Sequence, residues 1–296
     1  MSDRRVALVG DDGSVASAAR DAGVTVTASV ASLGSPAMVD TATPLPSLPV
    51  DDETDEADET DEVDETDWAG RTTPSGTQLP LDESSLDAIV AVGERALCET
   101  LRAAPGVPVL PVAVAGEEPP EATAETTATD GDPIETAPST ALSAFASGAV
   151  RTVDHRPVTV SVDGTAVGVA VLDTGLVTSE PARISEYSVH DGDRHVETVR
   201  SDAIVVSTPL GSRGYGRAAG GPVLAPGTGL AVTPVAPFAT AASPQVLPET
   251  VRLCVERDEG DVSLLVDDRA VGRVPPETPV RVVPRDSVAV VVPTEG

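Results

Sequence analysis

The residue pattern changes character near residue 147, and this change constrains the fold more than any other feature. Before that point, short apolar runs alternate with segments of helical periodicity. After it, Val, Thr, Gly and Pro dominate, and few segments have the length or periodicity of a helix. Alternating strands and helices favour a parallel sheet flanked by helices, whereas many short strands favour an all-β domain. We therefore predict two domains, an α/β domain over 1–146 and an all-β domain over 147–296.

The first domain contains four apolar runs with the length and β-branched content of buried strands. Two segments between them have helical character and end near a glycine or a small residue. The predicted strands are 6–9, 24–30, 86–92 and 108–114, and the predicted helices are 15–21 and 94–103. Between the first strand and helix stands Gly10-Asp11-Asp12-Gly13, which we interpret as the N-cap of that helix.

Two stretches of the first domain lack the apolar residues that a core requires. The first, over about 32–80, includes the run 51–67 with 12 acidic residues and no basic one. A segment of this composition cannot bury enough apolar area to offset the entropy of ordering, so we predict a disordered acidic insert. The second stretch, over about 116–138, is rich in Pro, Thr and acids, and we predict an insert or linker there.

The second domain opens with a hairpin signature. Two alternating apolar runs, 158–162 and 166–171, flank the dipeptide Asp163-Gly164, which favours a tight turn with positive φ at both residues. Further strands are expected towards the end of the chain, at 251–255, 262–266, 280–283 and 287–292.

The charge balance excludes several classes of protein. The chain has 19 basic and 48 acidic residues, a net charge of −29, and every basic residue is Arg. Such a surface is typical of solvation in concentrated salt, which screens charges over roughly 3 Å at 1 M, and its sign argues against nucleic-acid binding. Because the chain has no Lys, a Lys-dependent phosphate loop and Schiff-base catalysis are excluded.

The remaining reactive side chains give little sign of a metal site. We expect Cys98 and Cys254 to be buried small side chains without a disulfide, and His155, His190 and His195 to lie at the surface or in loops. No metal-ligand spacing is present among them. The chain also has no apolar run of membrane-spanning length and no leader-like start, so we expect a cytoplasmic protein without membrane contact.

One stretch has the composition of a nucleotide-binding loop. From Ser201 to Pro222 an acid precedes a short apolar strand, and the strand leads into a segment with five glycines between Ser207 and Gly221. Glycines let a backbone approach a ligand and present N–H groups to phosphate oxygens. Tyr215 is one of five aromatic residues in the chain and could stack on a base. A cluster of structural turns would explain the glycines equally well.

This stretch resembles the loop of the NAD kinase family, in a haloarchaeal type that suits the acidic composition. The family writes the loop as D-G-x-x-x-S-T-P-T-G-S-T-A-Y-x-x-S-x-G-G-P. Residues of this chain stand at matching positions at Asp202, Ser207, Thr208, Pro209, Gly211, Ser212, Tyr215, Gly220, Gly221 and Pro222. The family's T-A-Y core is here Arg213-Gly214-Tyr215, and its preceding Thr is Leu210. The segments 183–189 and 230–238 are similar to the family's L-N-E-V-V-I and T-P-I-C-P-H segments.

The resemblance implies a Rossmann-like α/β domain, an all-β domain and a dinucleotide held between them. It implies that the carboxylates of Glu186 and Asp202 converge on the loop around Tyr215. The full set of implied binding residues is Gly93, Ser185, Glu186, Asp202, Ser207, Thr208, Gly211, Ser212, Arg213, Gly214, Tyr215, Ala218 and Ala236. Arg213 and Arg217 either clamp a 2′-phosphate or pair with the acidic surface.

The family's catalytic motif, G-G-D-G-T, is degraded in this chain. The matching site after the strand 89–92 reads Gly93-Glu94-Arg95-Ala96. Glu94 is a carboxylate one residue early, and Arg95 stays protonated and cannot serve as a base. The implied ligands are NAD or NADP, with ATP and Mg²⁺ if the protein is active, in a homodimer or homotetramer. Three interpretations remain open: a dinucleotide-binding protein with little or no phosphoryl transfer, an active divergent kinase using Glu94, and a non-catalytic partner of a true kinase.

Overall fold

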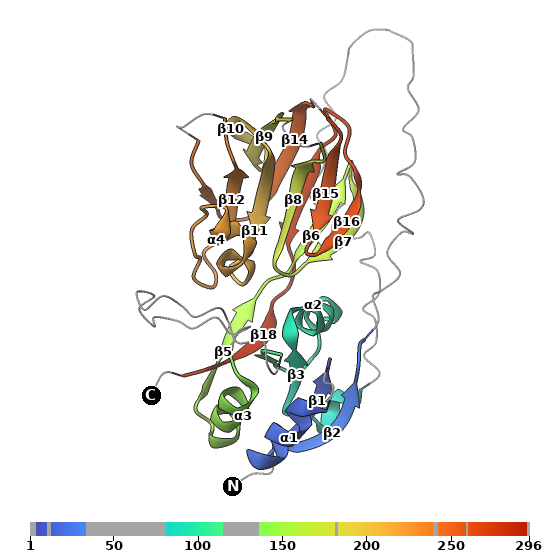
Figure 1. The fold of residues 1–296 in the computed structure, drawn as a ribbon, viewed down its shortest axis with the longest axis vertical. Coiled ribbons are helices and arrows are strands. Elements are labelled where there is room, and N and C mark those ends of the chain that lie inside the picture. The colour runs from blue at the N-terminus through green and yellow to red at the C-terminus, as the bar shows by residue number, and fades with distance from the viewer. Residues whose placement is uncertain are drawn as a thin grey trace.

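The computed structural model describes residues 4–10, 13–33, 81–114, 136–180, 183–238, 242–258 and 260–294. The predicted disordered insert falls largely outside these residues, as does most of the second insert. The described chain forms an α/β domain, in the lower part of Figure 1, and a β domain, in its upper part. Among the described residues, no helix is both long and apolar enough to cross a membrane.

The α/β domain is built on a six-stranded sheet with the order β2-β1-β3-β4-β18-β5. Its strands are β1 (Arg5–Val9), β2 (Thr25–Val30), β3 (Ala88–Val92), β4 (Val109–Val112), β18 (Val288–Pro293) and β5 (Val150–His155). Strands β1 to β4 run parallel, which confirms the parallel sheet predicted from the strand–helix alternation. β3 and β4 are buried along their whole length, which explains their continuous apolar sequences.

Helices cover both faces of this sheet. They are α1 (Ser14–Asp21), α2 (Gly93–Ala103) and α3 (Pro138–Ser147), with a short 3-10 turn, η2 (Glu83–Ser85), before β3. Side chains of α1 and α3 pack in one apolar cluster, and those of α2 pack in another on the opposite face. α1 begins after Gly13; Asp11 and Asp12, the acidic residues of the expected N-cap, lie outside the described residues. α3 was not predicted.

The last strand of the chain returns to the first domain. β18 lies between β4 and β5, parallel to β4 and antiparallel to β5. The sequence analysis had assigned everything after residue 147 to the all-β domain, whereas 150–155 and 288–293 complete the α/β sheet. The two strands leave the α/β domain side by side and connect it to the β domain (Figure 1).

The β domain consists of two six-stranded sheets packed face to face. One has the order β10-β9-β14-β17-β6-β7 and the other β13-β12-β11-β8-β15-β16. In chain order the strands are β6 (Val158–Val162), β7 (Thr165–Ala170), β8 (Asp173–Thr178), β9 (Ser185–Asp191), β10 (Arg194–Ser201), β11 (Ala203–Ser207), β12 (Leu230–Val235), β13 (Gln245–Leu247), β14 (Val251–Arg257), β15 (Val262–Val266), β16 (Arg269–Arg273) and β17 (Val280–Pro284). Apolar side chains from both sheets form one shared core, as in a β-sandwich.

The predicted hairpin is confirmed. β6 and β7 pair antiparallel, and Asp163 and Gly164 between them have φ values of 46° and 73°. Positive φ at both central residues is the requirement of the turn that Asp-Gly favours.

The junction between the two domains has its own apolar packing. Val171 and Leu172, between β7 and β8, and Leu210, after β11, belong to the same cluster as Leu97 and Leu101 of α2. Burial of these side chains fixes α2 against two connections of the β domain. This contact fixes the position of the glycine-rich segment, which begins beside Leu210, relative to α2.

Candidate functional site at the domain junction

The glycine-rich segment follows β11 at the end of the sandwich that faces the α/β domain. It contains a 3-10 turn, η4 (Gly211–Arg213), and a short helix, α4 (Tyr215–Ala218). Figure 1 shows α4 and its flanking turns beside this end of the β domain. The predicted loop is therefore present, and it lies at the junction.

The hydroxyl groups of Thr208 and Ser212 bind the protein's own backbone. Thr208 Oγ1 donates to the carbonyl oxygens of Val171 and Leu172, at 2.8 and 3.0 Å, and accepts from the Gly211 N–H at 3.2 Å. Ser212 Oγ donates to the Pro209 carbonyl at 2.8 Å and accepts from the Leu224 N–H at 2.9 Å. These side chains are buried, so their present contacts shape the segment.

Gly211 is required by close packing. A Cβ placed there would collide with the carbonyl group of Leu172, which is backbone and cannot move aside cheaply. The segment thus lies directly against the connection between β7 and β8. A side chain at this position would push the segment away from the junction.

The part of the segment open to solvent is its second half. Tyr215 is 53% exposed, and Gly214, Arg217 and Ala218 are also exposed. Arg213 is partly buried. An aromatic ring, two guanidinium groups and bare backbone are thus available to a ligand on this surface.

The residues Gly93 to Ala96, which the sequence analysis aligned with a catalytic motif, lie at the end of β3, on the α/β side. Gly93 has a φ of 78°, which favours glycine, and Glu94 occupies the first turn of α2. The helix has no side-chain cap at its start, and the first N–H groups of a helix favour an anion. The Arg95 side chain is 82% exposed and pairs with Glu99 at 3.1 Å. Arg95 is therefore held on the surface of α2 by its own helix.

A carboxylate that sequence reasoning missed belongs to this junction. Asp173 begins β8 and pairs with Ser207 at the end of β11. Burial, with a smaller effect of the nearby carboxylates of Asp267 and Glu94, raises the pKa of Asp173 from its ordinary 3.8 to about 7. Asp173 and Glu94, from the two domains, are thus close enough to interact. The sequence signal was one acid within the otherwise uncharged stretch 166–177.

Four predicted residues lie at the opposite end of the β domain. Asp202 precedes β11, whereas the glycine-rich segment follows it, so the strand's five residues separate them by about 16 Å. Ser185 pairs with Ser201, and Ala236 follows β12, whose Val235 pairs with Ala203. The expected convergence of carboxylates on the loop within one chain is therefore wrong, because an extended strand holds its two ends apart.

Glu186 stands opposite two arginines in the sheet at that far end. It pairs across the sheet with Arg200 of β10 and Arg257 of β14. Beside it, the Arg200 guanidinium stacks over Phe238 at 5.6 Å, and the Phe238 ring is 72% exposed. The far end thus combines charged groups with an exposed aromatic ring.

Of the three histidines, His155 differs from expectation. His155, at the end of β5, is only 5% exposed, and burial lowers its pKa to about 4 although it hydrogen-bonds the Val171 backbone. His190 and His195 lie on the strands β9 and β10, with ring centroids 5.2 Å apart. His195 is exposed, as expected of a surface residue, and His190 is partly buried. Cys98 and Cys254 are free and buried, as predicted. Within the described residues, no group of three or more His, Cys, Asp or Glu is arranged to hold a metal ion.

Comparison with known proteins identifies the family. The ATP-NAD kinase C-terminal domain model matches residues 145–293, which include the whole β domain and the glycine-rich segment. The chain belongs to the NAD kinase family. Within this family, the NAD kinase of Methanosarcina barkeri is 32% identical over 116 residues, which cover 38% of this chain and 42% of that protein. The bifunctional NADP phosphatase/NAD kinase of Methanocaldococcus jannaschii is 37% identical over 97 residues, which cover 32% and 17%.

Two solved structures of NAD kinase relatives share the fold. Yeast NADH kinase, complexed with NADH, has a TM-score of 0.57 and 16% identity over 71% of this chain and 64% of that one. The NAD kinase from Archaeoglobus fulgidus, in complex with ATP, has a TM-score of 0.55 and 17% identity over 97% and 92%. The two-domain α/β plus β architecture expected from the sequence is thereby confirmed. The sequence match to the curated relatives spans less than half their length, and Gly93 and Glu94 lie outside the family-model match.

Proposed function

We propose that this NAD kinase family protein binds a pyridine dinucleotide, NAD or NADP, at the junction between its two domains. The observation that carries the proposal is the glycine-rich segment, packed against α2 through Leu210 while Tyr215 is exposed beside it. Glycines, an exposed ring and two guanidinium groups on one surface suit a ligand with bases, riboses and phosphates. The yeast and Archaeoglobus relatives, solved with NADH and ATP, support this ligand class.

The exposed half of the segment would make the direct contacts. In this proposal Tyr215 stacks on a base, Gly214 and Ala218 offer backbone, and Arg213 binds phosphate, with Arg217 beside it. Ser207, Thr208, Gly211 and Ser212 support this surface from below, because they are buried. Asp173 joins the set as a carboxylate beside Ser207, able to accept a hydrogen bond from a ribose hydroxyl.

Phosphoryl transfer from MgATP to the 2′-hydroxyl of NAD is proposed to be weak or lost. Phosphoryl transfer depends mainly on positioning and on stabilisation of charge, and a carboxylate must reach the attacking hydroxyl. Glu94 is the carboxylate nearest to the family's catalytic position, and it stands at the start of α2, where an ATP phosphate would be favoured. The alternative, an active divergent kinase, is favoured by the proximity of Glu94 and Asp173 across the junction.

The far-end residues would serve a neighbouring copy of the chain. Ser185, Glu186, Asp202 and Ala236 cannot reach the segment of their own chain, because β11 lies between. In a homodimer or homotetramer, this end of one copy could complete the site of another. Replacing Asp202 by Ala should then weaken dinucleotide binding without weakening folding, because Asp202 is exposed.

Binding can be tested with the full chain in concentrated KCl. Saturating NAD or NADP should raise the melting temperature, because a ligand that binds only the folded state stabilises it. Tyr215→Ala should weaken binding by roughly ten-fold or more if the ring stacks on a base, while Tyr215→Phe, which keeps the ring, should bind nearly as well as the wild type. Absence of any shift with either dinucleotide would contradict the proposal.

Turnover separates the two versions of the function. The wild-type protein with NAD and MgATP should form NADP slowly or not at all, and formation at a clear rate would decide for the active kinase. In that case Glu94→Gln and Asp173→Asn should be compared, since the carboxylate that accepts the proton will show the larger loss of kcat. Arg95→Gln is the matched control on the same helix turn.

A further inference from the structure

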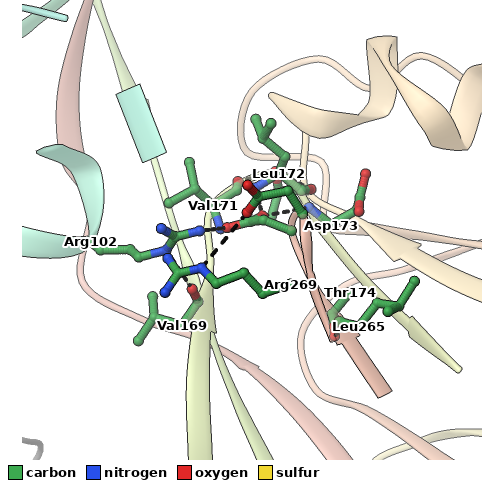
Figure 2. Close-up of polar contacts among 11 residues, drawn as sticks. Arg102, Val169, Val171, Leu172, Asp173, Thr174, Leu265 and Arg269 are labelled. Carbon is green, nitrogen blue, oxygen red and sulfur yellow. Dashed lines mark hydrogen bonds and ion pairs between the residues drawn. The ribbon is translucent and has the colours of Figure 1, made fainter. Parts of the chain in front are cut away.

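A buried ion pair joins the two domains. Arg102, in the last turn of α2, contacts the carboxylate of Asp267, in the turn between β15 and β16. The two side chains are only 7% and 2% exposed. Figure 2 shows Arg102 reaching from the α/β domain towards the connection between β7 and β8.

The same carboxylate fixes that connection. The N–H groups of Val171, Leu172 and Asp173 all donate to Asp267 side-chain oxygens, at 2.8 to 3.2 Å (Figure 2). The Asp267 N–H donates in return to the Asp173 carbonyl at 2.8 Å, and Asp267 has a φ of 51°. Arg102 Nε donates to the Val169 carbonyl at 3.0 Å. Asp267 and Arg102, with the Arg269 guanidinium beside them in Figure 2, thus hold residues 169–173 in place.

Residues 171–173 are also the support of the glycine-rich segment. The Thr208 N–H donates to the Leu172 carbonyl at 2.9 Å, and Gly211 packs against the same carbonyl group. Asp173 extends from this connection to the side of Ser207. A continuous set of contacts therefore runs from α2 through Arg102, Asp267 and residues 171–173 to Thr208.

Stability alone is a poor explanation for such a pair. Removing two charges from water costs several kcal/mol, and replacement of a buried ion pair by apolar side chains is often neutral or stabilising. The pair instead fixes a position, because its hydrogen bonds hold residues 171–173 in one place relative to α2. The helix that begins at Gly93 and Glu94 is the same helix that ends near Arg102.

We propose that Arg102 and Asp267 are positioning residues that hold the glycine-rich segment and Asp173 in register with the start of α2. Neither side chain has to touch the ligand. The inference rests on the proposed dinucleotide site for its functional consequence, whereas its structural consequence can be measured without any ligand.

The ligand-free experiment is amide hydrogen exchange on the full chain. Arg102→Gln and Asp267→Asn should speed exchange at Leu172, Asp173, Thr208 and Ser212 by ten-fold or more, while the sandwich core stays protected. Arg102→Lys keeps the charge but has one nitrogen in place of the guanidinium fork, so it should give a smaller increase. The matched control is Arg95→Gln, which breaks the pair with Glu99 on the same helix and should leave these amides unchanged. Unchanged exchange at Thr208 and Ser212 in folded Arg102→Gln would overturn the inference.

The ligand experiment separates positioning from simple destabilisation. Val160→Ala removes core volume within the sandwich and serves as a variant with lowered melting temperature and an untouched junction. Arg102→Gln should raise the Kd for NADP at least five-fold at a temperature where the protein is folded, while Val160→Ala should leave the Kd unchanged. Equal Kd values for both would overturn the inference. If the wild type binds no dinucleotide, the proposed function fails, and hydrogen exchange alone decides the role of the pair.

Discussion

Asp173 and Ser207 are paired residues on neighbouring antiparallel strands, so a carboxylate stands beside the last residue before the glycine-rich segment. This carboxylate is partly buried and close to two others, those of Asp267 and Glu94. The arrangement places a charge where the folded protein disfavours it, which is a common property of functional sites. The effect of this charge on the stability of the folded protein can be measured.

Replacement of Asp173 by Asn should stabilise the ligand-free protein at alkaline pH. The pKa of Asp173 is raised from its ordinary 3.8 to about 7, so the folded state retains a proton that the unfolded state loses. Its contribution to stability is full below pH 3.8 and is lost as the pH rises through 7. The melting temperature of Asp173→Asn minus that of the wild type should therefore be larger at pH 8 than at pH 5. For the exposed Asp154→Asn, the difference in melting temperature should not increase between pH 5 and pH 8. An equal difference at both pH values for Asp173→Asn would contradict the claim that burial raises the pKa of Asp173.

His155 should make the protein sensitive to acid. Burial lowers its pKa from 6.5 to about 4, so the unfolded state binds the proton first as the pH falls. The stability contribution of this residue is full above pH 6.5 and is lost as the pH falls through 4. Thermal unfolding of His155→Gln should show a shallower decline between pH 6.5 and 4 than that of the wild type. His195→Gln, which replaces an exposed ring, is the control and should follow the wild-type curve.

Two glycines of the segment should respond differently to a methyl group. Gly211→Ala places its Cβ against the Leu172 carbonyl and should lower the free energy of unfolding by about 2 kcal/mol or more. At Gly214 the nearest atom to a Cβ is 3.5 Å away, so Gly214→Ala should be tolerated. Urea unfolding of the two variants gives the comparison. Equal losses would mean that the segment does not pack on residue 172 in solution.

Concentrated salt should stabilise the protein. The net charge of −29 is screened over about 10 Å at 0.1 M salt but over only about 3 Å at 1 M. Because compaction brings like charges together, the melting temperature should rise steeply as KCl increases from 0.1 to 2 M. A salt-independent melting temperature would show that the acidic residues repel one another too weakly to matter.

Local patterns predicted much of the fold and part of the site. The buried strands 88–92 and 109–112 and the Asp163-Gly164 turn were recoverable because continuous apolar runs and turn chemistry act locally. α3 was missed because its sequence is short, small-residue-rich and preceded by a low-complexity stretch. The place of β18 beside β4 is a long-range pairing, which no local pattern encodes.

The same distinction between local patterns and long-range contacts applies to the candidate site. The glycine-rich segment was found from its composition, because clustered glycine and hydroxyl residues are typical of a backbone that approaches a ligand closely. The separation of Asp202 from Tyr215 was not found, since it depends on which end of β11 each residue occupies. Asp173, Arg102 and Asp267 meet only through packing between elements distant in the chain. They are separated by 71 residues, from 102 to 173, and by 94 residues, from 173 to 267, so no sequence motif contains them.

The position of β18 also bears on biosynthesis. Among the described residues, β5 pairs only with β18, and β4 has β18 as its outer neighbour. Residues 288–293 follow the whole β domain in the chain, so the sheet begun by β1 to β4 gains β18 only after that domain has been synthesised. The β domain can therefore assemble as an uninterrupted insertion between β5 and β18, before the α/β sheet is complete.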